Sequence, residues 1–385
     1  MHSPTIIELS RSAVQNNIEF IRKSICKDTR MSCILKGNAY GHGFGKYVEL
    51  LLENQIDHFS VFSSFEAYQI LSQMKGKRSF DLMIIGDIPD EHLEWVITHQ
   101  VEFYVFDFYR LERALKVAKS LNKKAYIHLE VETGMNRLGF EQADWTEAIE
   151  FLQRHKKYLV FKGLCTHYAG AESIANHTRI GMQIKKFQKA QNLCQTLGYP
   201  PQMVHSACSA AAIRFPKTRQ DLVRIGIIQY GFWPSEETFI RYITQRKNEQ
   251  NPLQKVLSWR SRVMSLKEVK RGEYVGYGMS YLTSENKKLA VVGVGYSNGF
   301  ARGLSNSGRV IIRGVRTQVI GTVNMNAITV DVTHIPDVQV GDDVILIGQS
   351  GQAEVSVSSF ANFSEQLNYE VLARLPLDIE RVVVD

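Results

Sequence analysis

The stretch Ile34-Leu35-Lys36-Gly37-Asn38-Ala39-Tyr40-Gly41-His42-Gly43 places a lysine where the apolar run Met31–Leu35 ends. A lysine at the end of a buried strand is costly unless its ammonium is neutralised or bonded. It can extend its ammonium into solvent, or it can be a partly desolvated Schiff-base lysine whose amine attacks a carbonyl. The glycines that follow allow backbone to approach a ligand closely. The residues alone leave both interpretations open.

Apolar runs of similar length recur from residue 31 to about residue 230, with amphipathic segments between them. Strands that alternate with helices predict a parallel sheet, and eight of them fit a (β/α)8 barrel, although a doubly wound sheet fits the alternation almost as well. The eight runs are Met31–Leu35, Phe59–Phe62, Leu82–Ile85, Phe103–Phe106, Ala125–Val131, Leu159–Cys165, Met203–Ala207 and Leu222–Ile228.

The pattern changes after about residue 235, where short runs rich in β-branched residues are separated by Gly, Asn or Asp. This pattern predicts a mainly antiparallel β domain. We therefore expect a barrel domain at residues 1–240 and a C-terminal β domain at residues 241–385. The strand-like segment Thr5–Ser10 precedes the barrel and is a candidate for the sheet of the second domain.

Composition narrows the class of protein. The net charge of +7 is spread along the chain, so nucleic acid is not an expected partner. No segment has the roughly 18 apolar residues that span a bilayer, so no membrane association is expected. The five cysteines have no Cys-x-x-Cys spacing, and no signal peptide is apparent, which indicates a cytoplasmic protein. The histidines have no metal-ligand spacing, so no metal is expected.

Polar residues end or follow five of the eight predicted strands, and in a barrel such positions line the active site. Loops after the last two strands of a barrel commonly bind phosphate through backbone amides. Ser209 and the amides of Gly226 and Ile227 are therefore candidate phosphate ligands. The five strand-end residues are Lys36, Glu130, His167, Ser209 and Arg224.

The lysine motif resembles that of the alanine racemase family, in which a pyridoxal-phosphate lysine precedes Asn-Ala-Tyr-Gly-His-Gly. The resemblance implies that Lys36 binds this cofactor and serves as one catalytic base. It implies that Tyr40, Ser209, Gly226 and Ile227 hold the phosphate. It assigns Arg224 to the pyridine nitrogen, and His167 to the link between Arg224 and the catalytic tyrosine. Because a guanidinium only donates, a ring nitrogen bonded to Arg224 must stay unprotonated.

The second domain carries Tyr274-Val275-Gly276-Tyr277-Gly278, and Tyr296 follows Tyr277 by nineteen residues. Both match motifs of the family at its spacing. Racemisation removes a proton from one face of the substrate and returns one to the other, so Tyr277 is the implied second base. Arg137 and the amide of Met325 align with the groups that bind the substrate carboxylate. The family also implies a homodimer with shared active sites.

The resemblance predicts interconversion of L- and D-alanine, the latter for cell-wall peptidoglycan. Serine, or a broader range of amino acids, is the alternative substrate. A barrel-type pyridoxal-phosphate decarboxylase and a barrel-only carrier protein are the rival classes. Five positions depart from the family pattern. Glu130 stands where many members carry a carbamylated lysine, and we expect its charge to orient Arg137 instead. The others are Cys208, Asn324, Asn326 and Leu377, the last in place of a phosphate-site tyrosine.

Overall fold

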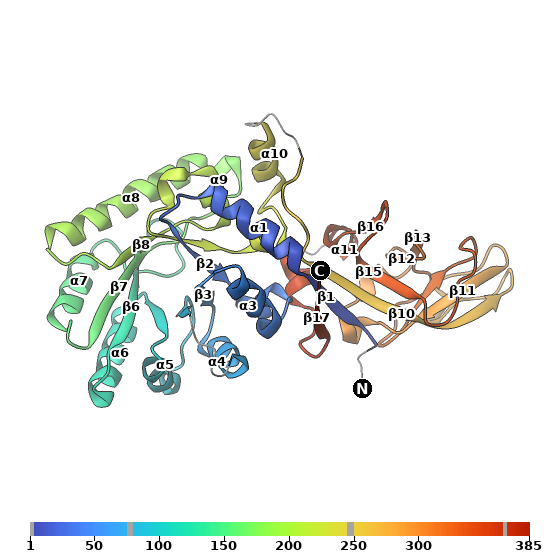
Figure 1. Cartoon of the computed structure of the whole chain (residues 1–385), viewed down its shortest axis with the longest axis horizontal. Coiled ribbons are helices and arrows are strands. Elements are labelled where there is room, and N and C mark those ends of the chain that lie inside the picture. The colour runs from blue at the N-terminus through green and yellow to red at the C-terminus, as the bar shows by residue number, and fades with distance from the viewer. Residues whose placement is uncertain (1–3, 75–79, 245–249, 365–367) are drawn as a thin grey trace. The chain divides into compact units, whose positions relative to one another are not determined.

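The computed structural model describes residues 4–74, 80–244, 250–364 and 368–385, and its elements are drawn in Figure 1. By packing, the chain divides into two units. The first comprises Ala13–Lys36 and Val48–Gln254. The second comprises the residues up to Ser12, the short segment Gly37–Tyr47, and Lys255–Asp385.

The first unit is built on eight parallel strands in the order β8-β7-β6-β5-β4-β3-β2-β9. The sheet closes where the Arg224 amide donates to the Ala207 carbonyl at 2.9 Å. Each strand begins within one residue of a predicted apolar run, and the predicted barrel is confirmed. The strands are β2 (Arg30–Ile34), β3 (His58–Val61), β4 (Asp81–Ile84), β5 (Glu102–Val105), β6 (Ala125–Glu130), β7 (Leu159–Cys165), β8 (Met203–His205) and β9 (Leu222–Ile225).

Amphipathic helices follow the strands on the outside of the barrel (Figure 1). Local signals fix their ends. Ser63 and Glu66 form a capping box at the start of α4, and Asp107 caps α6, which ends at the left-handed Asn122. Apart from the left-handed turn α2 (Lys36–Tyr40), the helices up to residue 244 are α1 (Arg11–Ser24), α3 (Phe44–Glu53), α4 (Ser64–Gln73), α5 (Leu93–Thr98), α6 (Phe108–Leu121), α7 (Trp145–Arg154), α8 (His177–Thr196), α9 (Ser209–Arg214) and α10 (Glu236–Thr244).

The second unit is a nine-stranded, mainly antiparallel sheet, and the predicted β architecture is confirmed. Strand β1 (Ile6–Ser10) pairs antiparallel with β10 and parallel with β17, so the first strand of the chain belongs to this sheet. Trp259, Phe300 and Phe360 pack together in its core. The other elements are β10 (Leu257–Val269), β11 (Lys287–Val292), β12 (Arg309–Ile312), β13 (Val315–Gln318), β14 (Ile328–Asp331), β15 (Asp343–Ser350), β16 (Ala353–Val355), β17 (Glu380–Val384), α11 (Val357–Ser364) and α12 (Asn368–Ala373).

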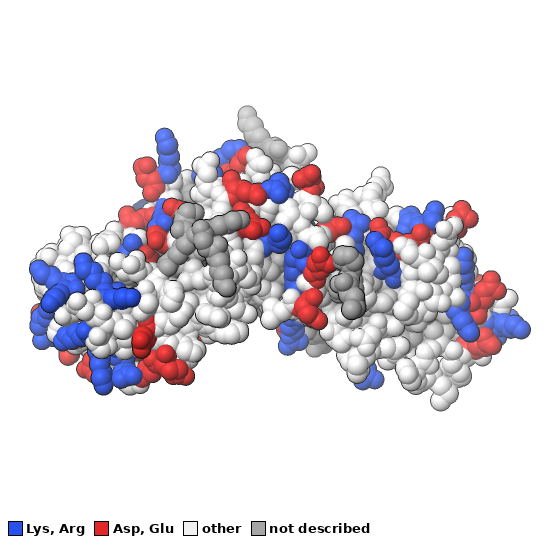
Figure 2. Space-filling view, turned by 60° about the horizontal axis from the view of Figure 1, so that its bottom comes forward, with Lys and Arg blue, Asp and Glu red and all other residues white. Residues whose placement is uncertain are grey.

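Two features of the division differ from the expected boundary at residue 240. The polar segment after residue 235 forms helix α10, which belongs to the barrel unit, and the second unit resumes at Lys255. Within the described ranges, no helix is long and apolar enough to cross a membrane. Acidic and basic side chains are interspersed on the face shown in Figure 2.

Candidate active site

Lys36 lies two residues after the end of β2, and the end of that strand is held firmly. The Tyr230 hydroxyl and the Gln229 side-chain amide donate to the Ile34 carbonyl at 2.8 and 3.2 Å. Burial lowers the pKa of the Lys36 ammonium, and the charge of Arg137 lowers it further. A lowered pKa increases the fraction of neutral amine, which is the form that attacks a carbonyl.

The residues after Lys36 form a left-handed turn, labelled α2 (Lys36–Tyr40). Gly37 has a φ of 64°, and Asn38, Ala39 and Tyr40 have φ values of 54°, 53° and 50°. Each residue with a Cβ pays roughly 1–2 kcal/mol in this conformation. Backbone bonds from Gly41 and Gly43 to the carbonyls of Gly37 and Asn38 close the turn, at 3.0 and 2.9 Å. Such strain is typical of functional sites.

Tyr40 lies in the segment that belongs to the second unit. Its ring packs on that of Tyr369 with centroids 5.9 Å apart. Arg381 of β17 donates to the Gly41 carbonyl at 3.0 Å. A Cβ on Gly41 would lie 2.0 Å from the Leu372 carbonyl oxygen, so only glycine fits there. Contacts from the C-terminal end of the chain therefore shape the turn that follows the lysine.

The candidate phosphate ligands meet where β8 and β9 end. The Gly226 amide donates to the Ser209 hydroxyl oxygen at 2.8 Å, so the serine is already oriented. Ile227 begins the 3-10 segment η4 (Ile227–Tyr230), and Gly226 precedes it. Since the Gly226 amide is occupied, the Ser209 hydroxyl hydrogen and the Ile227 amide are the donors of this group suited to a phosphate.

Arg224 is buried, and both of its terminal nitrogens are bonded to protein. Nη1 donates to His205 Nδ1 at 2.6 Å and to the His205 carbonyl at 3.1 Å. Nη2 donates to the carbonyls of Thr166 and Ser206 at 2.7 and 3.1 Å. No residue in the described ranges accepts a hydrogen bond from its Nε. A rigid guanidinium with one remaining donor suits a ligand nitrogen that only accepts.

His167 follows β7, and its ring makes no hydrogen bond with Arg224, whose donors go to the groups just named. The two interact through charge. Burial lowers the pKa of the His167 imidazole to about 3, and Arg224, Arg137 and Lys36 contribute to the lowering. His167 is therefore a neutral imidazole that can both donate and accept a hydrogen bond at physiological pH.

Glu130 ends β6 in a buried position where its Oε2 has no hydrogen-bond partner among the described residues. Burial raises the pKa of this carboxyl to about 7, against the opposing charges of Arg224 and Arg137. Arg137 makes no hydrogen bond with Glu130, so of the interaction expected between these two residues only that of their charges is present. The raised pKa follows from a carboxyl that lost water without gaining a donor.

Two residues that the sequence did not single out shape the loop bearing Arg137. The Glu132 carboxylate accepts from the backbone amides of Gly134, Met135 and Asn136, the last two at 2.8 Å. Gln183 of α8 is buried, accepts from the Ala169 amide at 2.9 Å and donates to the Thr133 hydroxyl of this loop at 3.3 Å. The sequence offered a signal for Glu132, which stands two residues before a glycine. It offered none for Gln183, which resembles any polar residue on an amphipathic helix.

In the second unit, Tyr277 and Met325 lie on exposed loops. Tyr277 begins the 3-10 segment η5 (Tyr277–Met279) and is 75% exposed, and Met325 is 56% exposed. Their loops are well ordered by hydrogen bonds: Thr322 donates to the Tyr277 carbonyl at 3.1 Å, and Ser297 donates to the Met325 carbonyl at 2.7 Å. Other large apolar side chains are exposed in the same unit, among them Tyr274, Met279, Leu282 and Tyr296.

Three of the departures from the family pattern lie near these loops or at the C-terminal end. The Asn326 side chain donates to the Ser297 hydroxyl at 2.7 Å, and the Asn324 carbonyl accepts from the Tyr296 amide at 3.0 Å. Leu377 is 67% exposed. In the barrel, burial raises the pKa of the Cys208 thiol, so this residue is a neutral thiol beside Ser209.

Comparison with known proteins identifies the family. The model of the alanine racemase N-terminal domain matches residues 9–234, and that of the alanine racemase C-terminal domain matches residues 256–383. This chain belongs to the alanine racemase family. It is 34% identical to an alanine racemase of Leptospira interrogans over 380 residues, which cover 98% of this chain and 95% of that protein. The prediction that it is an isomerase of this family is thereby confirmed.

Solved alanine racemases share the whole architecture. The enzyme of Clostridium difficile superposes with a TM-score of 0.89 at 27% identity, covering 100% of this chain and 96% of that one. The enzyme of Bacillus anthracis, with bound L-Ala-P, superposes with a TM-score of 0.88 at 26% identity, again covering 100% and 96%. Both the barrel and the β domain of this racemase-family chain are therefore represented in each relative.

Proposed function

We propose that this chain interconverts L- and D-alanine with pyridoxal phosphate, using Lys36 and Tyr277 as the two bases. The observation that carries the proposal is Lys36 with its lowered pKa, just beyond the strand that precedes the left-handed turn. Members of the family use this cofactor, and three groups of the barrel fit it. They are the Lys36 amine, the unused Nε donor of Arg224, and the Ser209 hydroxyl beside the Ile227 amide.

Pyridoxal phosphate, when bound, withdraws the charge left at the substrate α-carbon after its proton is removed. The residues of this chain move the proton. In the proposal, the Lys36 Nζ takes or returns it on the D face and the Tyr277 hydroxyl on the L face, because one base cannot serve both faces without moving round the substrate. Arg224 holds its guanidinium proton, so the group that it contacts stays unprotonated.

The proposal includes a homodimer in which each Tyr277 serves the barrel of the other chain. A tyrosine that is 75% exposed lacks the enclosure that a proton-transfer site requires. Tyr274, Met279 and Leu282 are also exposed around it. Exposed apolar side chains of this kind support a surface that is covered by another protein chain. Arg137 and the Met325 amide are proposed to bind the substrate carboxylate. The five free thiols support a reducing, cytoplasmic compartment.

The test follows the optical activity of L-alanine by circular dichroism with purified, cofactor-loaded protein. The signal should decay to zero for the parent and stay constant for Lys36→Ala, which should also lose the visible absorbance of bound cofactor. Lys156→Ala, an exposed lysine outside the site, is the matched control and should behave as the parent. Release of carbon dioxide instead of loss of optical activity would favour the decarboxylase.

A further inference from the structure

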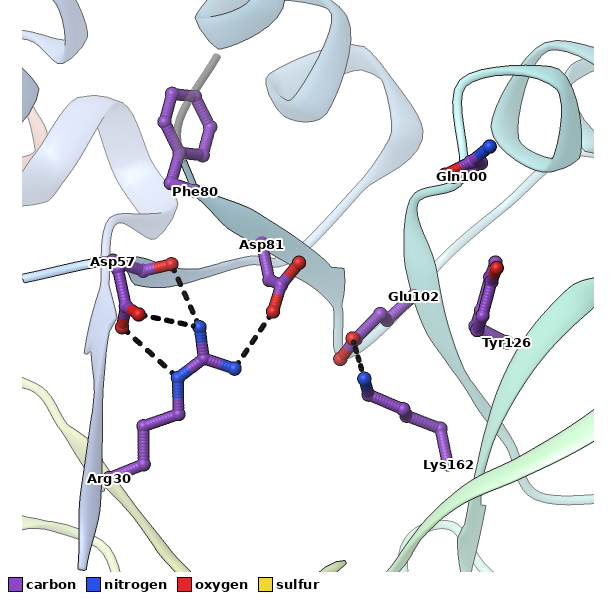
Figure 3. A pocket seen from close by; sticks show the side chains of 8 residues that line it. All are labelled: Arg30, Asp57, Phe80, Asp81, Gln100, Glu102, Tyr126 and Lys162. Carbon is purple, nitrogen blue, oxygen red and sulfur yellow. Dashed lines mark hydrogen bonds and ion pairs between the residues drawn. The ribbon is translucent and has the colours of Figure 1, made fainter. Parts of the chain in front are cut away.

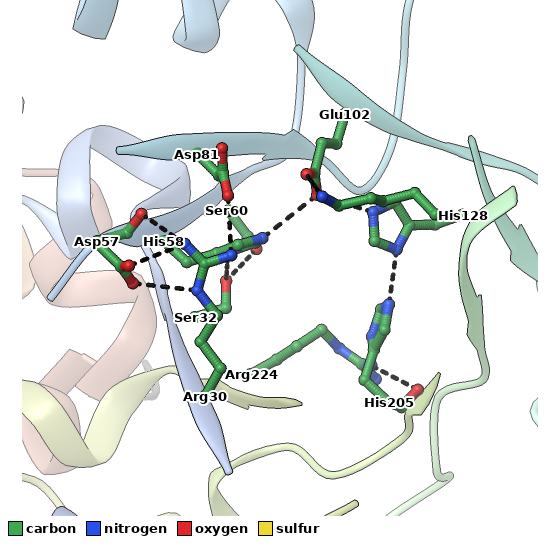
Figure 4. Close-up of polar contacts among 11 residues, drawn as sticks. Arg30, Ser32, Asp57, His58, Ser60, Asp81, Glu102, His128, His205 and Arg224 are labelled. Carbon is green, nitrogen blue, oxygen red and sulfur yellow. Dashed lines mark hydrogen bonds and ion pairs between the residues drawn. The ribbon is translucent and has the colours of Figure 1, made fainter. Parts of the chain in front are cut away.

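A line of polar side chains crosses the interior of the barrel behind Arg224 (Figure 4). Arg224 Nη1 lies 2.6 Å from His205 Nδ1, and His205 Nε2 lies 2.8 Å from His128 Nδ1. His128 Nε2 lies 2.9 Å from Glu102 Oε2. These four side chains, called the histidine relay below, are all buried and come from four different strands. Barrel interiors are normally filled by branched apolar residues, so a line of buried polar side chains is unusual there and suggests a specific role.

The chemistry of its two ends fixes every proton of the histidine relay. Arginine can only donate, so His205 Nδ1 accepts and its proton resides on Nε2. That Nε2 then donates to His128 Nδ1, which places the second proton on His128 Nε2, where an ionised Glu102 accepts it. Both rings are therefore neutral, and burial lowers the pKa of both imidazoles. One consistent pattern of donors runs from Arg224 to Glu102.

Glu102 ends the histidine relay at the opposite, N-terminal face of the barrel. It begins β5 and borders a pocket of about 570 Å³, where Lys162 Nζ approaches its Oε1 at 3.2 Å (Figure 3). Its Oε2 also accepts from His58 Nε2 at 3.4 Å. Hydrogen bonds from the two histidines lower the pKa of the Glu102 carboxyl in spite of burial. The acceptor at the end of the relay is thus a charged one, which strengthens its bonds.

The backbone of β7 makes room for the histidine relay. A Cβ on Gly163 would lie 2.1 Å from His128 Nδ1, so a side chain there would displace the ring. The pairing of β6 with β7 shifts between Ile127 and His128, so that Lys162 is the extra residue of a bulge. Bulges commonly redirect side chains next to functional sites. Gly163 and the bulge at Lys162 thus help to place His128 in the histidine relay.

We propose that Glu102 and His128 are positioning residues that hold the Arg224 guanidinium in place from the far end of the barrel. The proposal rests on the proposed function for the role of Arg224. The geometry of the histidine relay does not depend on that function. With the donors all pointing one way, His205 presents a lone pair to Nη1 and cannot rotate without leaving a buried donor unpaired. Loss of the charge on the acceptor at Glu102, or of the space for His128, should loosen Arg224 and leave the substrate carboxylate ligands untouched.

Three variants of the cofactor-loaded protein test this. Glu102→Gln with Lys162→Met removes both charges together, so that no ammonium is left unpaired. Gly163→Ala keeps every relay side chain but displaces the His128 ring. Asp81→Asn is the control, because it makes the same carboxylate-to-amide change in the same pocket, where Asp81 bonds Arg30 at 2.8 Å, outside the relay. Circular dichroism of each variant shows whether it is folded.

We expect the double variant and Gly163→Ala to lower kcat about tenfold with KM for alanine unchanged. The visible absorption maximum of the bound cofactor should shift, because in the proposed function Arg224 would be the residue that contacts its ring nitrogen. Asp81→Asn should change none of these. Folded relay variants with the kcat and spectrum of the parent would overturn the proposal.

The ring ¹⁵N resonances of the parent provide a readout that is independent of activity. Assigned through His128→Gln and His205→Gln, they should show both rings neutral with the proton on Nε2. A proton on Nδ1 of either ring would refute the relay even in an active racemase. If instead the parent fails to racemise alanine while both rings show the expected form, the proposed function fails and the geometry of the relay stands.

Discussion

Glu130 carries a buried carboxyl to which no residue in the described part of the chain donates a hydrogen bond in place of the water it lost. In the folded chain its pKa is about 7, against an ordinary value of 4.5. A carboxyl whose pKa is raised on folding binds its proton more tightly in the native state. Ionisation of Glu130 therefore lowers the free energy of unfolding. This loss is absent below about pH 4.5, grows between the ordinary and the folded-state pKa, and is complete above about pH 7. That full cost is on the order of 3 kcal/mol.

Glu130→Gln removes this titration, because an amide does not ionise. The unfolding temperature of the variant should rise relative to that of the parent as the pH increases from about 5 to about 8. Thermal unfolding of both proteins across this range, followed by circular dichroism at matched cofactor saturation, measures the difference. A constant difference over the range would show that Glu130 does not titrate there.

Leu377 is the residue where a change of specificity is expected. It lacks the hydroxyl and some of the bulk of the tyrosine common at this position in the family, and we expect measurable activity on serine. Leu377→Tyr should lower the ratio of kcat/KM for L-serine to that for L-alanine, by up to about tenfold. Leu377→Phe restores the bulk without the hydroxyl and separates the two effects. An unchanged ratio in both variants would mean that this position does not set specificity.

At the scale of elements, the left-handed turn after Lys36 is the most constrained segment of the site. Gly41 has a φ of 78° and faces the Leu372 carbonyl, which a Cβ would meet at 2.0 Å. Gly198 has a φ of 66° but no neighbour within 4 Å of such a Cβ. The pair separates the cost of the left-handed backbone from the cost of the clash.

Gly198→Ala should cost about 1 kcal/mol, the usual penalty for a left-handed residue with a Cβ. Gly41→Ala should cost more than about 3 kcal/mol, because its methyl meets a backbone oxygen that cannot turn away. Thermal unfolding of the two variants gives the comparison. Equal losses would show that the C-terminal segment yields easily and does not constrain the turn.

The strands were predictable from sequence because each is a short apolar run, and β2 and β7 were placed within one residue. The turn was not, since Asn38 is followed by Ala39 and Tyr40, which rarely adopt positive φ on their own. The positions of Lys36, Ser209 and Arg224 at the ends of barrel strands were predictable because each lies in or just after an apolar run, while their roles stay predictions. The histidine relay was not, because a histidine inside an apolar run does not reveal which partner it will meet across a barrel.

At the scale of the whole molecule, the proposed dimer builds each site from two chains. Lys36→Ala and Tyr277→Phe should each be inactive. In a mixed dimer of the two variants, one site combines both mutations, but the other combines an intact lysine with an intact tyrosine. Co-expression with different affinity tags, followed by purification of the mixed species, should therefore restore up to about half of the parent activity. Failure of the mixed species to regain activity would place both residues of a site in one chain.

The assignment of the two bases to opposite faces is tested most directly by α-proton exchange in deuterated water. The measurement uses cofactor-loaded Tyr277→Phe, with visible absorbance to confirm that the cofactor is retained, and NMR to follow loss of the α-proton from each enantiomer. The account predicts that D-alanine still exchanges through Lys36, while L-alanine barely exchanges and no racemisation occurs. Equal exchange from the two enantiomers would contradict it.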